Sequence, residues 1–368
     1  MKPTAEQQLQ FLQHLQRLFD EGDFVATYKY ALLMSLAELA VESGVDEGEL
    51  ELPMIDVAEK FAELYWSQTL PFVSGVPGAS AAILTQNQGK QAAVVNALSV
   101  LRSQGAATIA QAMRLPDWMP TIRSIAKTVA EMPVKYLQNV GSIQVAFLYD
   151  YPNPRGKIVL KPGVAFMLRT FHPLIQQLAR SGWVRHVREN TRNAAVIGQA
   201  DQLESFMFGA SRNALAAAGV VLGKMQSGKC FYCGKTISST GDVDHFIPWS
   251  KYPRDLAHNF VLAHPACNRR KSDMLGAERH LHHWLERNFR YGSDIAGEMK
   301  GFLADNECSN RVARWAYEQG IASQARGWVE KRITESLTNR CIEALNSDAH
   351  TDCIDLAPTS TFNQQMSF

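Results

Sequence analysis

The stretch 228–273 reads GKCFYCGKTISSTGDVDHFIPWSKYPRDLAHNFVLAHPACNRRKSD and holds a dense set of metal-binding and acid–base side chains. It begins with Cys230 and Cys233, whose spacing lets two thiolates on one tight turn bind a single zinc ion. His264 and Cys267 repeat that spacing, 31 residues after Cys233. Two such pairs predict a structural zinc with three cysteine ligands and one histidine ligand.

The zinc prediction leaves two alternatives, one for the role of the cysteines and one for the identity of the fourth ligand. A single C-x-x-C pair also fits a redox-active dithiol, so the second pair decides in favour of zinc. His264 is the least firmly placed ligand, and His258 is the nearest substitute. The other three cysteines, Cys308, Cys341 and Cys353, are scattered along the chain, and we expect them to be buried or inert.

Between the two pairs the sequence places Asp244 and His245, then Asn259, and Asn268 follows Cys267 directly. This order resembles the HNH, or ββα-metal, endonuclease family, in the branch whose fold is pinned by zinc. The resemblance implies a β-hairpin with the acidic residue and the histidine base, a loop with the middle Asn, and a helix with the third motif residue. That third residue is Asn where the family name has His, a variant with the pattern Cys-Asn-x-x-Lys. The resemblance covers about 45 of the 368 residues.

Phosphodiester hydrolysis explains why these residue types are needed together. A hard divalent cation must neutralise charge on the scissile phosphate and on the leaving 3′ oxygen. Asp244 and the amide oxygen of Asn268 are donors of the kind that Mg²⁺ or Mn²⁺ prefers, so we expect them to be the catalytic metal ligands. Neutral histidine accepts a proton near neutral pH, which makes His245 the expected general base. Asn259 is expected to hold the loop and orient the imidazole. The resemblance implies products with 5′-phosphate and 3′-hydroxyl ends.

Five basic residues near the motif are candidate phosphate contacts, because nucleic-acid backbones are bound largely by Arg and Lys. They are Arg269, Arg270 and Lys271 at the expected start of a helix, and Lys251 and Arg254 in the preceding loop. A second basic stretch contains Arg180, Arg185, Arg188 and Arg192, with Trp183 and His186. For this stretch a solvated helix face is the favoured interpretation, and binding of nucleic acid or a regulatory ligand is the alternative. Solvent-exposed charge is the alternative for the first set.

Charge is unevenly distributed, although the whole chain has a net charge of only +1. Residues 1–70 carry 4 Lys/Arg against 13 Asp/Glu, whereas residues 71–223 carry 15 against 6. Residues 224–290 carry 11 against 6, and residues 291–368 carry 7 against 11. A polyanion is therefore expected to dock on the middle and motif-bearing segments, and the acidic first 70 residues are excluded as the DNA-binding face.

Apolar periodicity predicts a mainly α fold with small β elements, divided into four segments. Residues 1–70 are expected to form a helical, or winged-helix-like, platform for regulation or for binding a partner protein or a second copy. Residues 71–223 are expected to be a mixed helical and hairpin accessory or sensor region. Residues 224–290 are the expected nuclease domain, and residues 291–368 a helical extension with a loose polar tail.

Three local expectations bear on the site. Residues 142–151 and 156–160 are β-prone and are predicted to pair as a hairpin. A single helix is predicted over 202–226, leading directly into Cys230. After Asp273 the pattern predicts helix to about Leu345.

The composition and the first residues of the chain indicate where in the cell the protein is expected. The chain is 46% hydrophobic and 20% charged, which is typical of a globular protein. Its first residues lack the apolar core of a signal peptide, and no apolar run reaches the roughly 20 residues that a membrane span needs. We therefore expect a cytoplasmic protein without a membrane partner.

The resemblance implies a metal-dependent endonuclease of nucleic acid, with DNA preferred and RNA left open. An HNH module joined to a large accessory region is similar to bacterial restriction and anti-phage effectors. Two alternatives remain. A zinc-stabilised binding protein without catalysis would not need Asp244, His245 and Asn268 together. A homing or recombination nuclease would differ only in its target.

Overall fold

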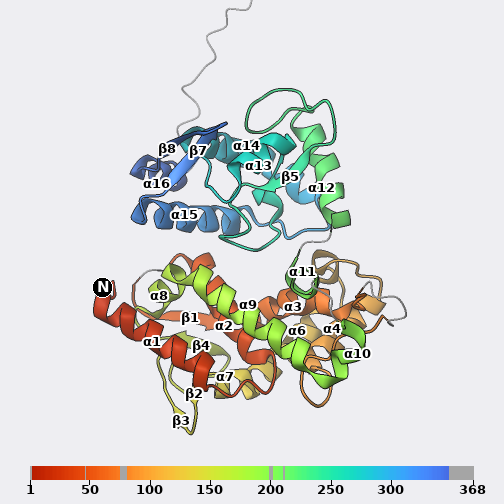
Figure 1. Ribbon diagram of the computed structural model, residues 1–368, viewed down its shortest axis with the longest axis vertical. Coiled ribbons are helices and arrows are strands. Elements are labelled where there is room, and N and C mark those ends of the chain that lie inside the picture. The colour runs from red at the N-terminus through yellow and green to blue at the C-terminus, as the bar shows by residue number, and fades with distance from the viewer. Residues whose placement is uncertain (1, 46, 75–80, 199–201, 210–211, 348–368) are drawn as a thin grey trace, which may run out of the picture.

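The computed structural model describes residues 2–45, 47–74, 81–198, 202–209 and 212–347. Helices dominate this part of the chain, and its strands form two-stranded antiparallel sheets. The predicted fold class, mainly α with small β elements, is therefore confirmed. Figure 1 shows two lobes, with α1 to α11 in the lower one and α12 to α16 in the upper one. Among the described residues, no helix is both long enough and apolar enough to cross a membrane.

The N-terminal lobe is built around α2 (Tyr28–Ser43). Every residue of this helix from Tyr28 to Val41 is buried, which is the pattern of a helix enclosed on all sides. The lobe's other helices surround α2, and most of them share one hydrophobic core with it. They are α1 (Ala5–Glu21), α3 (Met54–Trp66), η1 (Ser67–Thr69), α4 (Ala93–Ser103), α5 (Ile109–Ala112), α6 (Trp118–Glu131), α7 (Pro133–Tyr136), α8 (Val164–Thr170), α9 (His172–Glu189), η2 (Thr191–Asn193), α10 (Ala194–Ile197) and α11 (Leu203–Phe208).

The C-terminal lobe has two smaller cores, one around Trp284, Trp315 and Trp328 and one between α12 and the following sheet. Its helices are α12 (Arg212–Met225), η3 (Ala257–Asn259), α13 (Pro265–Lys271), α14 (Glu278–Glu298), α15 (Asn306–Ala322) and α16 (Asn339–Asn346). Its strands are β5 (Asp242–His245), β6 (Phe260–Ala263), β7 (Arg326–Glu330) and β8 (Ile333–Ser336), which pair β5–β6 and β7–β8.

Buried polar contacts join the two lobes through the loop that follows β5. The guanidinium of Arg254 donates through Nε to Oε2 of Glu38 on α2 at 2.8 Å. The Tyr252 hydroxyl donates to Glu42, one turn further along the same helix. A second junction pairs Arg169 of α8 with Glu318 of α15 at 3.0 Å. The loop after β5 is therefore fixed from both lobes.

Two of the expected segment boundaries, near residues 70 and 290, fall within hydrophobic cores of the structure. The boundary expected near residue 70 crosses a single core, which contains side chains from α2, α3, α6 and α9. The expected boundary near 290 likewise falls inside one core, because Trp315 and Trp328 pack with the segment that carries the cysteine pairs. Charge marks surfaces, whereas core membership depends on tertiary packing.

Strand pairing in the N-terminal lobe also differs from expectation. The strand β4 (Lys157–Leu160) pairs with β1 (Leu50–Pro53), and the short strands β2 (Asn139–Val140) and β3 (Ile143–Gln144) pair with each other. Residues 142–151 meet β4 only through a single bridge, between Tyr149 and Leu160. The predicted hairpin is therefore wrong. β1, the strand described within the first 70 residues, takes its partner far along the chain.

Two predicted helices are interrupted. The helix expected over 202–226 is divided after α11 at Gly209, where a Cβ would lie only 2.4 Å from the Ser205 carbonyl oxygen. The helical pattern after Asp273 gives way to the β7–β8 hairpin, whose turn places Lys331 in the left-handed region with φ of 47°. The polar tail predicted from Asn346, with Cys353, lies almost entirely outside the described residues.

Candidate zinc centre and catalytic residues

The quoted stretch folds as two strands followed by a helix. β5 runs antiparallel to β6, with Asp244 opposite Val261 and His245 opposite Phe260. The helix α13 begins directly after β6, with proline in its first turn, where the missing N–H costs no hydrogen bond. This ββα arrangement brings the motif residues of three sequence segments into one unit.

The four predicted zinc ligands lie together. The ligand atoms of Cys230, Cys233, His264 and Cys267 are all within 4.8 Å of one another. A tetrahedral zinc with Zn–S bonds of about 2.3 Å holds its sulfur ligands roughly 3.8 Å apart, which lies within this limit. His258, the alternative to His264, is buried elsewhere and contacts the Gly292 carbonyl oxygen through Nε2 at 3.1 Å.

The chemistry of the cluster also fits a bound cation. His264 donates through Nε2 to the Thr236 carbonyl oxygen at 3.1 Å, which directs Nδ1 toward the sulfurs as the ligand atom. Burial and the neighbouring Cys230 and Cys233 sulfurs raise the pKa of Cys267 to about 12. Three clustered thiolates therefore need a positive charge among them, which is what Zn²⁺ supplies.

The purified chain is expected to contain about one tightly bound zinc ion, because four ligands complete one tetrahedral site. Mass spectrometry of the acid-digested protein measures the metal content. Cys233→Ser should lose the zinc, whereas Cys308→Ser, which alters a cysteine outside the cluster, should keep it. A folded wild-type protein without zinc would remove the basis for this centre.

Asp244 is held by two donors from different parts of the lobe. The Tyr232 hydroxyl donates to its Oδ2 at 2.5 Å, and the Lys271 ammonium lies 3.1 Å from the same oxygen. Lys271 also donates to the His245 backbone carbonyl at 3.0 Å. Burial lowers the pKa of Lys271, although Asp244 opposes that shift. Both contacts use one carboxylate oxygen, so they fix the carboxylate while Oδ1 can still act as a metal ligand.

Asn268 contacts a carboxylate that the sequence analysis did not single out. Its amide nitrogen donates to Oδ2 of Asp242 at 3.2 Å. Asp242 lies two residues before Asp244 on β5, so the two carboxylates project from the same face of the strand. The D-x-D alternation was a usable signal, because a period of two identifies one face of a strand.

His245 lies against a second residue that the sequence analysis missed. Its Nε2 is 2.9 Å from Oδ1 of Asp255, and its side chain is 13% exposed. The rings of Trp249 and Phe260 stand edge-on to the imidazole at 5.1 and 5.0 Å. No local pattern could have identified Asp255, because it faces His245 only when the loop between them folds back.

Asn259 ties this loop to the sheet. Its amide oxygen accepts from the Ile247 N–H at 2.7 Å, and its amide nitrogen donates to the Ile247 carbonyl at 3.0 Å. The segment around Asn259 is itself anchored, since Trp284 and Arg287 of α14 both donate to the His258 carbonyl. These are backbone contacts of the kind expected for a residue that holds the loop after His245.

The motif residues therefore gather on one ββα unit but face different partners. Asp244 contacts Tyr232 and Lys271, Asn268 contacts Asp242, and His245 contacts Asp255. Convergence of Asp244, His245 and Asn268 on one phosphate remains a prediction.

The candidate phosphate contacts divide into buried and accessible side chains. Lys271 is fully buried against Asp244, and Arg254, whose side chain is 14% exposed, is paired with Glu38, so the charge of each is already matched within the protein. Their burial comes from tertiary packing that local sequence does not reveal. Arg269 and Arg270 are exposed on α13, and Lys251 is partly exposed. Of the five, these three keep side chains that a phosphate can reach.

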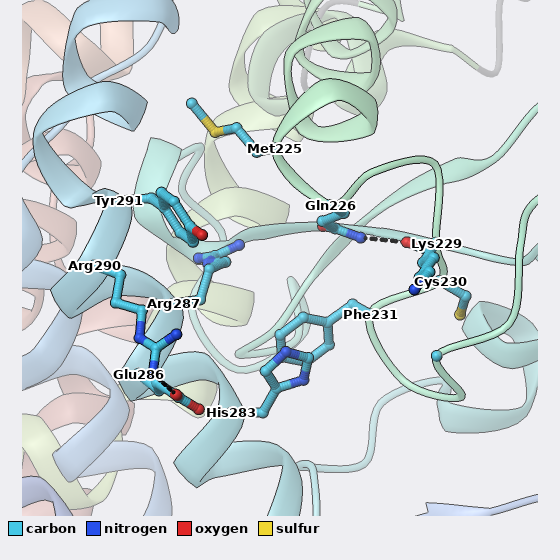
Figure 2. A pocket seen from close by; sticks show the side chains of 11 residues that line it. Met225, Gln226, Lys229, Cys230, Phe231, His283, Glu286, Arg287, Arg290 and Tyr291 are labelled. Atoms are coloured by element: carbon cyan, nitrogen blue, oxygen red, sulfur yellow. Dashed lines mark hydrogen bonds and ion pairs between the residues drawn. The ribbon is translucent and has the colours of Figure 1, made fainter. Parts of the chain in front are cut away.

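Figure 2 shows a cavity of about 280 Å³ behind the zinc-binding turn. The rings of Phe231 and His283 stack within it, with centroids 4.5 Å apart. Arg290 pairs with Glu286 at 2.6 Å, and Arg287 donates to backbone carbonyls of η3 and β6. Both arginines of this cavity are therefore already engaged within the protein.

Comparison with known protein families agrees with the residues of the site. A family model described as HNH endonuclease matches residues 230–274, which confirms the resemblance. A second family model, described as Domain of unknown function (DUF8808), matches residues 8–205. Searches of curated proteins and of solved structures give no match to the chain.

Proposed function

Because the chain belongs to the family described as Domain of unknown function (DUF8808) and carries an HNH endonuclease domain, we propose that it is a metal-dependent endonuclease whose substrate is DNA. One observation carries the proposal. β5 presents a carboxylate and an imidazole on consecutive residues, and each is oriented by a partner of its own, Lys271 for Asp244 and Asp255 for His245. A zinc-stabilised binding module would have no need of that arrangement.

His245 is the proposed general base. An ionised carboxylate accepts hydrogen bonds and donates none, so the contact with Asp255 places the imidazole hydrogen on Nε2. The lone pair is then on Nδ1, which can take a proton from a water molecule beside the scissile phosphate. Trp249 and Phe260 restrict the rotation of the ring. Asp255 thus acts as a positioning residue for His245.

Asp244 and Asn268 are the proposed ligands of a catalytic Mg²⁺ or Mn²⁺ ion, and Asp242 adds a third oxygen donor beside them. Carboxylate and amide oxygens on one side of β5 are the donor set that these hard cations prefer. When bound, the cation supplies charge neutralisation on the phosphate and on the leaving oxygen. Lys271 and Tyr232 keep the Asp244 carboxylate in place for this role.

The exposed charges of α13 are the proposed contacts to the flanking backbone. Arg269 and Arg270 follow Asn268 on the same short helix, and Lys251 lies in the loop after His245. Phosphate contacts of this kind fix the position of a duplex without reading its sequence. Specificity would then come from elsewhere in the chain.

The proposed setting is restriction of foreign DNA or another anti-phage defence in the bacterial cytoplasm. It rests on analogy with effectors that join an HNH module to an accessory region. In this setting the N-terminal lobe recognises the DNA or a signal and governs the nuclease domain. The buried contacts of Arg254 and Tyr252 with α2 give that lobe a direct connection to the loop that carries Asp255.

In the presence of Mg²⁺ the zinc-loaded protein is expected to nick supercoiled plasmid DNA and to leave 5′-phosphate and 3′-hydroxyl ends. Such ends can be sealed by DNA ligase without prior treatment, so resealing of the gel-purified nicked product is the measurement. A matched RNA substrate distinguishes the two nucleic acids. Nicks that need a kinase or a phosphatase before ligation would contradict the proposed chemistry.

A further inference from the structure

A cavity of about 480 Å³ lies at the junction of the two lobes. The N-terminal lobe contributes Trp66, Arg180 and Phe208 to its wall, and the loop after β5 contributes Trp249 and Asp255. Its volume is within the range of small-molecule sites, about 300–1,000 Å³. Figure 1 shows α11, which ends at Phe208, close to the boundary between the lobes.

Arg180 stands out among the residues of this wall because it is mostly buried and has no ion-pair partner among the described residues. It lies mostly buried on α9, and no described carboxylate lies within ion-pair distance of its guanidinium. Its Nε is buried without a hydrogen-bond partner, and its guanidinium lies over the Phe208 ring at 5.2 Å from the centroid. Burial lowers the pKa of Arg180 to about 10. A buried cation without a counter-ion is costly, and a bound anion would remove that cost.

The nearby buried carboxylate does not neutralise Arg180. Glu38 accepts from both Nε and a terminal nitrogen of Arg254, and also from the Gln176 amide at 3.2 Å. The lobe therefore brings two arginines toward one carboxylate and pairs only Arg254 with it. Glu204 also attracts Arg180, but neither carboxylate forms an ion pair with it, so its charge stays available to a ligand in the cavity.

The aromatic side chains determine which anion suits the cavity. Phe208, Trp66 and Trp249 contribute aromatic rings to the cavity wall, and Arg102 already covers one part of Trp66 at 4.3 Å. Guanidinium groups match phosphate geometry, and aromatic rings stack on nucleobases. A ligand with a phosphate and a planar base satisfies both features, whereas inorganic phosphate satisfies only the first.

The cavity also borders the proposed general base. Trp249 stands edge-on to the His245 imidazole, and Asp255 holds its Nε2. A ligand in the cavity would contact the two residues that orient His245. The cavity in Figure 2 has no such unpaired arginine beside its aromatic rings, because Arg287 and Arg290 are paired within the protein.

We propose that the junction cavity binds a nucleoside phosphate, with the phosphate on Arg180 and the base against the aromatic wall. The binding site itself does not depend on the proposed nuclease function. Its effect on catalysis does, because that effect acts through the proposed general base. The nucleoside phosphate is either a nucleotide of the substrate strand near the scissile phosphate or a free nucleotide that acts through Trp249 and Asp255. Both sources share the same recognition chemistry.

The test compares Arg180→Gln with Arg17→Gln, a matched substitution at an exposed arginine of α1 that lies outside both basic stretches. One arm titrates zinc-loaded, full-length protein with deoxyadenosine monophosphate and with inorganic phosphate, using calorimetry. The other arm measures KM and kcat for a DNA substrate. Arg180→Lys is a second variant that keeps the charge but loses the planar fork, and thermal unfolding shows whether each variant is folded.

If the site takes a substrate nucleotide, Arg180→Gln should raise KM for DNA about tenfold and leave kcat nearly unchanged. If it takes a free nucleotide, the same change should weaken nucleotide binding about tenfold and leave KM unchanged. In both cases Arg180→Lys should show a smaller effect in the same direction. Either result supports the proposal.

Two results would overturn it. One is an Arg180→Gln protein that matches Arg17→Gln in both arms. The other is inorganic phosphate binding as tightly as the nucleotide, which would show an anion site without base recognition. The calorimetric measurement does not depend on cleavage. If the protein binds the nucleotide but cuts no nucleic acid, the nuclease assignment is rejected and the proposed nucleotide site is kept. Normal cleavage with no effect of Arg180 would reject this inference alone.

Discussion

His245→Ala is expected to lower the rate of DNA cleavage by about 10²–10⁴-fold, the usual contribution of general acid–base catalysis. The imidazole is the group on this ββα unit that is suited to take a proton from water near neutral pH. Removing it leaves the proposed metal ligands Asp244 and Asn268 in place, so DNA binding and the fold should change little. Single-turnover nicking of plasmid DNA measures the rate.

His282→Ala is the matched control for this change. His282 lies on α14 with its side chain 59% exposed, and its nearest charged partner is Glu278 on the same helix. Its replacement should leave the cleavage rate within about twofold of wild type, because an exposed substitution away from the site changes little. A His245→Ala protein that cleaves as fast as His282→Ala would reject the assignment of the base.

Glu38→Ala is expected to lower the free energy of unfolding by about 3–5 kcal/mol, the usual cost of removing one partner of a buried ion pair. Glu38 is fully buried and accepts hydrogen bonds from Arg254 and Gln176. Without it, Arg254 would stay largely buried in the lobe junction with only a longer contact, 3.8 Å, to Glu63. Equilibrium unfolding in urea, followed by tryptophan fluorescence, measures the loss.

Glu51→Ala provides the comparison for an exposed ion pair. Glu51 pairs with Lys157 at 2.6 Å across β1 and β4, but its side chain is 61% exposed. Solvent screening limits such pairs to about 0–1 kcal/mol. If Glu38→Ala destabilises the protein no more than Glu51→Ala does, the junction is not held by the Glu38–Arg254 pair.

The zinc ligands could be predicted because their arrangement depends on short-range sequence. Spacing placed Cys230, Cys233, His264 and Cys267 around one point, and the structure gathers them there. Zinc ligands on two tight turns depend on few other residues, so their geometry is encoded locally. The HNH identity of the stretch rests on the same local order.

The partners of the motif residues depend on tertiary packing and were not predictable in the same way. Asp255 reaches His245 only because the loop between them is held by α2. Lys271 and Arg254 resemble solvent-exposed phosphate contacts in the sequence, and their burial becomes evident only when Tyr232 and Glu38 pack against them. Composition distinguishes charged residues from apolar ones, but it does not show which charges become buried.

The same limit explains the errors in the fold. β4 pairs with β1, more distant in sequence than the segment that seemed its natural hairpin partner. The β7–β8 hairpin follows a long helical region, and its strands contain the β-prone residues Val329, Ile333 and Thr334. A stricter count of β-branched residues would have signalled that hairpin. The pairing of β1 with β4 has no comparable local signal.

The central claim is that the side chains around β5 form a metal-dependent nuclease site. The most direct test incubates zinc-loaded protein with supercoiled plasmid, first in the absence of added divalent cations and then after titration with Mg²⁺ or Mn²⁺. We expect no nicking without the added cation and saturable nicking with it. A folded protein that retains its zinc and leaves DNA and RNA intact with either cation would contradict the claim.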